Sequence, residues 1–332
     1  MFNTTIKDKY LNQFISNILD FISRVKSNNI KNKFIVYTIF EGNNSTNSKL
    51  FDRPNPDYNK ELIRYYNTMN KFNKLLNNFI EFKIIIPKKN IDLNEISKKL
   101  NTFSLNIEIL ELPELQNKKI HNGFDYIILG GKYLEEKYPK KIIIHNDIDM
   151  ELLNLGIFSF IDNIFLKDKT SIIVGNAKLD YIDIHDIRHQ DDEYFIADTC
   201  FIASLGKNNY YSLWWDTYIR LNNIAIPNKK ILERTYLNLD SFDYYLEEIS
   251  MDYLINTKLK NKLTSLDNFQ FGEGYNYLDT IHIKYWPNIY YKHEHIYINK
   301  SNRINNLKSY KQEKIFFKRP VINILNNLES RE

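Results

Sequence analysis

The sequence predicts an α/β fold with a Rossmann-type, mostly parallel central sheet flanked by helices, and with a C-terminal α+β elaboration. Between residues 30 and 150, apolar runs rich in β-branched residues alternate with stretches of helical periodicity. This alternation is typical of βαβ units, whose strands are parallel. The run at residues 142–144 is apolar without polar alternation, which indicates a strand buried on both faces. After residue 150 the alternation becomes less regular.

The individual elements follow from the spacing of apolar residues and from turn signals. Apolar residues at helical spacing predict helices at residues 8–27, 60–79, 93–100, 124–138, 207–222, 240–259 and 301–308. Runs rich in β-branched and aromatic residues predict strands at residues 34–40, 82–87, 105–112, 140–149, 170–175 and 194–205. Gly130 and Gly131 are unusual inside a helix. Residues 178–193, which are dense in Asp and His, are expected to form a loop.

Composition excludes several classes of protein. The chain has 332 residues and a net charge of +4, and its lysines are scattered without the dense basic stripe of a nucleic-acid binder. Residues 1–9 are polar and no run of 18 apolar residues occurs, so we expect no membrane span. The single cysteine, Cys200, allows no internal disulfide and is typical of a reducing compartment. We therefore expect a cytoplasmic protein.

Two carboxylates follow the most apolar strand. Asp147 and Asp149 are separated by one residue at the end of the run at 140–149, and the period of a strand would place both on one face. Ligands of open α/β sheets bind at the carboxyl ends of the strands. Paired carboxylates there suit a hard divalent cation that also binds phosphate oxygens. The pattern predicts a Mn²⁺ or Mg²⁺ site on Asp147 and Asp149.

Three segments in this order carry a resemblance to a known family. Residues 140–149 match a strand ending in Asp-X-Asp, residues 195–202 resemble a Phe-Asn-Ser/Thr-Gly-Val strand, and residues 250–256 with 262–267 resemble Asp-Gln-Asp-X-Leu-Asn and its trailing motif. Together they resemble the GT-A-fold glycosyltransferases, closest in layout to the retaining family 8, which includes glycogenin and galactosyltransferase relatives. The chain departs from the family at Asp198 (usually Asn), at Cys200 (usually Gly), and at Ser250 and Met251 (usually Asp-Gln).

The resemblance implies roles for residues in the donor pocket. Tyr37, Thr38 and Phe40 stand where relatives hold the nucleotide base, at the end of the first strand. Asp198 and Asp252 are the candidates for catalytic-site residues that hold sugar hydroxyls, because carboxylates accept strong hydrogen bonds.

The resemblance also implies a C-terminal histidine as third metal ligand. His295 is favoured because Lys300 follows it at a suitable distance in the sequence, and Lys300 would then contact the departing diphosphate. His293 and His282 remain alternatives, and none of the three has the glycine that the family pattern places nearby.

The implied reaction is transfer of a hexose or N-acetylhexosamine from a nucleoside diphosphate sugar, with UDP-sugars favoured, to a hydroxyl of a glycan, protein or small-molecule acceptor. Retention of anomeric configuration is also implied. We expect a GT-A-like domain over residues 1–300, with a nucleotide-binding half (1–150) and an acceptor and sugar half (151–300), and an extension at 301–332. Two alternatives are a nucleotidyltransferase that uses the paired aspartates and a non-catalytic GT-A-fold scaffold protein.

Overall fold

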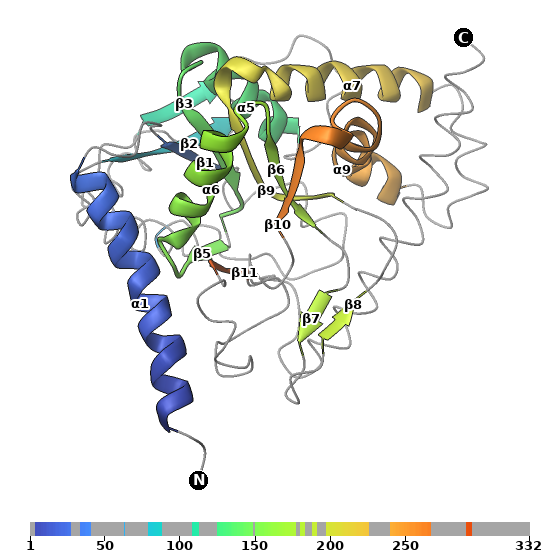
Figure 1. Cartoon of the computed structure of the whole chain (residues 1–332). Helices are drawn as coiled ribbons and strands as arrows, with labels where there is room; N and C mark the ends of the chain where they lie inside the picture. Colours follow the sequence, from blue (N-terminus) through green and yellow to red (C-terminus); the bar gives the residue numbers. More distant parts are fainter. Residues whose placement is uncertain are drawn as a thin grey trace.

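A seven-stranded sheet forms the centre of the computed structural model (Figure 1). The structure describes residues 4–27, 34–40, 63, 79–87, 108–112, 125–148, 150–176, 180–182, 188–190, 197–225, 240–266 and 290–293. In chain order the strands of the sheet are β1 (Phe34–Ile39), β2 (Ile80–Pro87), β3 (Glu108–Leu112), β4 (Ile142–Asn146), β6 (Ile172–Asn176), β9 (Ala197–Leu205) and β10 (Leu263–Leu266).

The spatial order of the strands is β10-β6-β9-β4-β1-β2-β3. Strand β9 runs antiparallel to β4 and β6, and every other pair in this sheet is parallel. The predicted α/β fold with a mostly parallel sheet is therefore confirmed. Strands from before and after residue 150 join the same sheet. The domain boundaries expected at residues 150 and 300 stay predictions.

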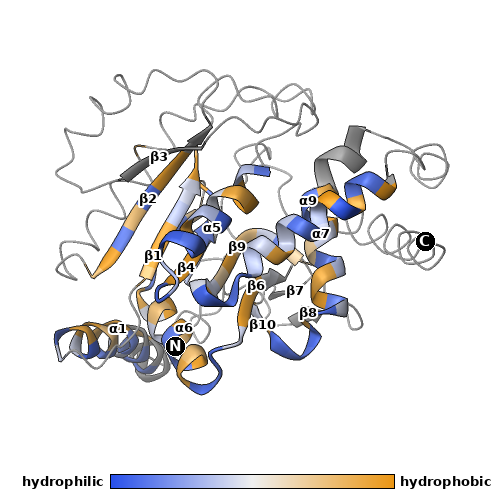
Figure 2. Cartoon of the chain, turned by 90° about the horizontal axis from the view of Figure 1, so that it is seen from above, coloured by the Kyte–Doolittle hydropathy of each residue, from blue (hydrophilic) through white to orange (hydrophobic). Residues whose placement is uncertain are grey.

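Helices cover both faces of the sheet (Figure 2). One face packs against α1 (Thr4–Lys26) and α6 (Gly156–Lys167), and the other against α5 (Asp125–Lys137), α7 (Tyr210–Ala225) and α9 (Asp240–Thr257). Strand β4 shows why this requires a continuous apolar run. Ile142 and Ile144 belong to the first core and Ile143 to the second, and all three are fully buried. A strand without a solvent face favours apolar residues, because a buried polar group without a partner costs free energy.

Short elements complete the described structure. They are the 3₁₀ turns η1 (Gly206–Asn208) and η2 (Lys260–Lys262), the antiparallel pair β5 (Met150–Leu152) and β11 (Tyr291–His293), and the antiparallel pair β7 (Asp180–Ile182) and β8 (Arg188–Gln190). Both strand pairs lie below the main sheet in the view of Figure 1. None of the helices within the described ranges has the length and apolarity needed to cross a membrane.

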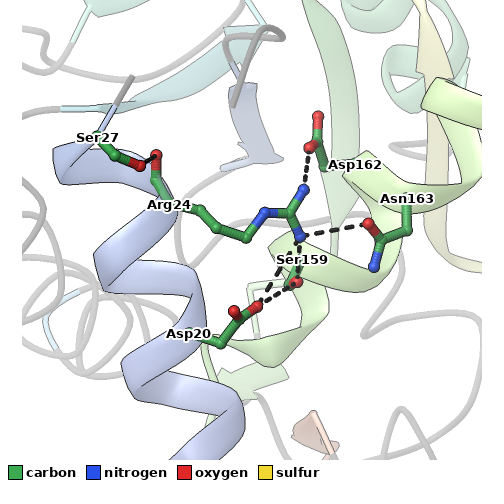
Figure 3. A network of polar contacts seen from close by, with 6 residues as sticks. All are labelled: Asp20, Arg24, Ser27, Ser159, Asp162 and Asn163. Carbon is green, nitrogen blue, oxygen red and sulfur yellow. Dashed lines mark hydrogen bonds and ion pairs between the residues drawn. The ribbon is translucent and has the colours of Figure 1, made fainter. Parts of the chain in front are cut away.

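An arginine attaches α1 to the rest of the fold (Figure 3). Arg24 donates from Nη2 to Asp162 on α6 at 2.7 Å, and from Nη1 to Ser159 Oγ at 2.7 Å. Asp162 is fully buried, and a buried carboxylate is costly unless it is paired. The ion pair therefore attaches the C-terminal part of α1 to α6, and Phe21 packs there against Phe158 and Phe79.

The two glycines of α5 are explained by close packing. A Cβ atom at Gly130 would lie 2.4 Å from Ile85 Cδ1, and one at Gly131 would lie 2.1 Å from Tyr211 Cδ1. Helix α5 thus approaches both the sheet and the beginning of α7 more closely than a side chain would allow. The helix predicted at 124–138 is confirmed despite these glycines.

A carboxylate from α5 completes this junction. Glu135 is fully buried and accepts hydrogen bonds from the N–H of Tyr211 (3.0 Å), the N–H of Ser212 (2.6 Å) and Ser212 Oγ (2.6 Å). The first N–H groups of a helix have no partner within it, so Glu135 supplies one for α7. Burial raises the pKa of Glu135, although the hydrogen bonds from Ser212 and Tyr211 oppose that shift.

Other sequence predictions have mixed outcomes. The helices at 8–27, 207–222 and 240–259 and the strands at 34–40, 82–87, 105–112, 170–175 and 194–205 are confirmed with small shifts of their ends. The prediction of a loop at 178–193 was wrong in part, because β7 and β8 form an antiparallel pair there. Strands of three residues are too short to show a period in the sequence. Helix α6 was not predicted. The predicted helices at 60–79, 93–100 and 301–308 fall almost entirely outside the described residues.

We expect Gly131→Ala to lower the free energy of unfolding. A helical glycine-to-alanine change gains about 1 kcal/mol of helix propensity, but overpacking against the buried Tyr211 ring costs about 1–3 kcal/mol or more. Urea unfolding followed by circular dichroism measures the net loss. Glu136→Ala, an exposed change on the same helix, is the control and should shift stability by less than about 0.5 kcal/mol. A Gly131→Ala protein as stable as the wild type would contradict this packing.

Candidate functional site at the carboxyl edge of the sheet

The strand order reverses between β1 and β4. From β1 the chain builds outward through β2 to β3, whereas β4, β9, β6 and β10 lie on the other side of β1. Ligands of open α/β sheets bind at the carboxyl ends of the strands where the order reverses. Tyr37 pairs with His145 in this parallel register, so the end of β1 and the residues that follow β4 flank the reversal.

Asp147 is the first partly exposed residue after the buried strand β4. Its side chain is 32% exposed, whereas all five residues of β4 are buried. The Asp147 N–H donates to Cys200 O at 3.0 Å, and the Asp147 carbonyl accepts from the Met150 N–H at 3.0 Å. The second bond closes a four-residue turn at residues 147–150.

This turn corrects the predicted extent of the strand. The strand was expected to continue to residue 149, but β4 ends at Asn146, because the hydrogen bond between Asp147 and Met150 bends the chain toward β5. Asp149 itself lies outside the described residues. Its pairing with Asp147 as a metal ligand stays a prediction.

A bulge in β9 lies directly beside Asp147. Against β6, Val174 pairs with Ile202 but Gly175 pairs with Asp198, so residues 199–201 are inserted on the β9 side. On the other side of β9, Phe201 still pairs with Asn146. Such bulges are frequent next to active sites, where they redirect side chains.

Asp198 and Asp252 are brought together at the start of β9. Asp198 is buried, and its Oδ1 accepts from the Cys200 N–H at 3.3 Å. Asp252, on α9, is fully buried, and its Oδ1 accepts from the Ala197 N–H. The two predicted site carboxylates are therefore linked: Asp198 belongs to β9, and Asp252 is hydrogen-bonded to the neighbouring residue of that strand, Ala197. Asp252 thus has a structural contact, and its role toward a sugar stays a prediction.

A C-terminal strand reaches the same edge. Strand β11 pairs antiparallel with β5, and His293 stands opposite Met150 in this register. Met150 directly follows Asp149, so the histidine-containing segment lies next to the acidic turn. His295, His282 and Lys300 lie outside the described residues, and their roles stay predictions. Within the described ranges, no three His, Cys, Asp or Glu side chains are grouped as a metal site.

The predicted base-binding residues lie at the end of β1, on the opposite side of the reversal from Asp147. Thr38 and Phe40 are buried, and Thr38 Oγ1 has no hydrogen-bond partner within the described part of the chain. Tyr37 is fully buried, and its hydroxyl donates to Ile127 O at 2.7 Å. Burial, then the nearby Tyr211, raises the pKa of Tyr37 well above its usual value. Binding of a nucleotide base by Tyr37, Thr38 and Phe40 stays a prediction.

His145 was missed by the sequence analysis. It is fully buried in β4, and its Nε2 lies 3.0 Å from Asp147 Oδ1. The available signal was a lone histidine that ends an apolar run two residues before the first aspartate.

Comparisons with known proteins add little. No protein-family profile and no curated protein matches the sequence. Similar solved structures include a 4-diphosphocytidyl-2C-methyl-D-erythritol synthase from Anaerococcus prevotii, with 14% identity, a TM-score of 0.36, and coverage of 85% of this chain and 98% of that chain.

Two further similar structures are glycosyltransferases. One is involved in glycosylation of the major capsid of PBCV-1 (8% identity, TM-score 0.38, 83% of this chain and 99% of that chain). The other is apo-form GlyE of Streptococcus pneumoniae TIGR4 (11% identity, TM-score 0.39, 90% of this chain and 64% of that chain). At such low identities and TM-scores, these likenesses carry no conclusion about family or reaction.

We expect Asp252→Ala to destabilise the protein by about 1–3 kcal/mol, because it removes a buried hydrogen bond between the Ala197 N–H and the Asp252 carboxylate. Asp252→Asn keeps an oxygen at that position and should lose less. Urea unfolding compares the two, with Asp216→Ala on the exposed side of α7 as control. If Asp252→Ala is as stable as the control, the hydrogen bond does not hold β9 in place.

Proposed function

We propose that this chain is a metal-dependent glycosyltransferase that moves a hexose or N-acetylhexosamine from a nucleoside diphosphate sugar, preferably a UDP-sugar, to an acceptor hydroxyl. The observation that carries the proposal is the position of Asp147. It is a partly exposed carboxylate at the carboxyl end of β4, where the strand order reverses. An Asp-X-Asp sequence at that point of an α/β sheet fits a cation that binds a diphosphate.

The residues around the carboxyl edge of the sheet would each bind one part of a nucleoside diphosphate sugar or its metal ion. Asp147 and Asp149 would hold Mn²⁺ or Mg²⁺, because carboxylate oxygens are the ligands that these hard cations prefer. His295, with His293 and His282 as alternatives, would be the third ligand, and the pairing of β11 with β5 supports a C-terminal ligand. When bound, the cation would neutralise charge on the leaving diphosphate as a Lewis acid.

The protein's own groups would bind and orient the other parts of the donor. Tyr37, Thr38 and Phe40 would line the base side, and Lys300 would contact the diphosphate as a point charge. Asp198 and Asp252 would accept hydrogen bonds from sugar hydroxyls. The acceptor would be a glycan, a protein or a small molecule. The single cysteine supports action in the cytoplasm.

One assay separates this proposal from its two alternatives. The protein is incubated with Mn²⁺ and a panel of nucleotide sugars, and released nucleoside diphosphate is measured. In parallel it is incubated with nucleoside triphosphates and sugar phosphates, and released pyrophosphate is measured. Nucleoside diphosphate release supports the proposal, pyrophosphate release indicates a nucleotidyltransferase, and neither product indicates a scaffold protein.

We expect Asp147→Asn to weaken Mn²⁺-dependent UDP binding by at least about tenfold, equivalent to about 1.4 kcal/mol, because the amide removes one anionic ligand. Asp149→Asn should have a similar effect. Isothermal titration calorimetry with and without Mn²⁺ measures the change.

The matched control for this measurement is Asp168→Asn. Asp168 is exposed and precedes β6, so it lies at the amino end of that strand and away from the carboxyl edge. The amide of an asparagine there keeps an acceptor for the Thr170 N–H. This variant should bind UDP like the wild type. Equal UDP affinity of the wild type with and without Mn²⁺ would refute the metal dependence.

We expect neutral hexose or N-acetylhexosamine donors to be used in preference to uronic acids. An ionised Asp198 accepts hydrogen bonds from hydroxyls and repels a second carboxylate in a partly dry site. A screen of UDP-sugars measures the preference, and Asp198→Asn should be milder than Asp198→Ala because the amide keeps one acceptor. UDP-glucuronate as the best donor would remove Asp198 from the sugar pocket.

A further inference from the structure

We infer that His145 is a positioning residue, which fixes the carboxylate of Asp147 for its ligand. The inference rests on the proposed function for the role of Asp147, but its geometry is independent of that function. His145 Nε2 and Asp147 Oδ1 are 3.0 Å apart. The histidine is fully buried, whereas the aspartate is 32% exposed. The contact therefore joins the interior of the sheet to its carboxyl edge.

This contact is the only hydrogen bond of the His145 side chain within the described residues. The other ring nitrogen, Nδ1, is buried and has no partner in the described part of the chain. An ionised aspartate only accepts hydrogen bonds, so the contact requires the proton on Nε2. Nε2 of the imidazole thus contacts Asp147, whereas Nδ1 contacts no polar group of the described residues.

The surroundings of His145 are otherwise those of an apolar residue. Ile143 precedes it on the same face of β4 and is fully buried, and the Tyr37 ring packs against the imidazole with centroids 5.0 Å apart. A buried polar group with an unsatisfied atom costs stability. Packing alone would be served better by an apolar side chain. What the histidine adds is the hydrogen bond to Asp147.

The imidazole is itself held in place. Tyr37 lies beside it in the β1–β4 register, and the Tyr37 hydroxyl is bonded to Ile127 O on α5 at 2.7 Å. The Tyr211 ring, at the start of α7, packs edge-on against Tyr37 with centroids 6.0 Å apart. The sheet and two helices therefore limit rotation of the ring that holds Asp147.

Occupation of Oδ1 has a consequence for ligand binding. It restricts rotation of the carboxylate, and the second oxygen, Oδ2, would then face a cation. Residues that orient a metal ligand in this way typically change metal affinity by about 10–100-fold when mutated.

Two isosteric substitutions test the role of Nε2. Glutamine places its amide nitrogen near the position of Nε2, and asparagine places its amide nitrogen near Nδ1. We expect His145→Asn to lower Mn²⁺-dependent UDP affinity by about tenfold or more, and His145→Gln to retain most of the wild-type affinity. Isothermal titration calorimetry measures both variants, and thermal unfolding shows that each is folded.

Ser204→Ala is the matched control for a buried polar change in the same sheet. Ser204 lies on β9, paired with Ile143 and Ile172 away from the carboxyl edge, and its Oγ is also buried without a partner within the described residues. This variant should keep wild-type affinity. A loss equal to that of His145→Asn would show a general effect of perturbing the sheet and would overturn the inference.

A second readout needs neither metal nor nucleotide. In ¹⁵N-histidine-labelled protein, we expect His145 to show a proton on Nε2, and we expect its Nε2 signal to shift in Asp147→Ala. If His145→Asn does not fold, this measurement decides. A His145 signal that does not respond to Asp147→Ala overturns the inference.

The outcomes for the inference and for the proposed function are distinguishable. If the wild type shows no Mn²⁺-dependent UDP binding, the proposed function fails and the role of His145 fails with it. If the wild type binds but His145→Gln and His145→Asn lose affinity equally, only the role of His145 is overturned.

Discussion

Because helices cover both faces of the β1–β4 pair, almost every side chain of these two strands is removed from solvent. The first partly exposed residue after β4 is a carboxylate, Asp147. A buried polar group without a partner costs free energy, and among the described residues the side chain of His145 has its hydrogen-bond partner at the strand end, in Asp147. The burial that makes the sheet stable thus also directs its polar chemistry to one edge.

The support of that edge extends into the helices. Gly131 allows α5 to contact the Tyr211 ring, and Glu135 accepts the first N–H groups of α7. Together they fix Tyr211 beside Tyr37, and Tyr37 beside His145. Glycines that weaken a helix in isolation here permit the packing on which the position of the site residues depends.

Periodicity was sufficient to predict six of the strands of the main sheet and the helices α1, α5, α7 and α9, because each of these elements repeats a burial pattern along its length, but it missed α6, the strand β10 and the short strands β5, β7, β8 and β11. It could not predict the end of β4, since the turn at residues 147–150 depends on one hydrogen bond between Asp147 and Met150. Nor could it predict the bulge in β9 or the pairing of His293 with Met150. These features join residues that are distant in sequence or interrupt a period, and they are the ones that surround the candidate site.

The charges at the edge bear on why a cation is part of the proposed reaction. The Asp147 N–H donates to Cys200 O, and the Cys200 N–H donates to the carboxylate of Asp198. The carboxylate of Asp252 accepts from the N–H of Ala197, the residue before Asp198. Three carboxylates are thus connected through a few residues of β9. A diphosphate approaching them alone would meet like charge in a partly buried setting, where screening is weak. In the proposed reaction, a divalent cation held by Asp147 would offset this repulsion, which gives a physical reason why an acidic edge and an anionic donor would require a metal.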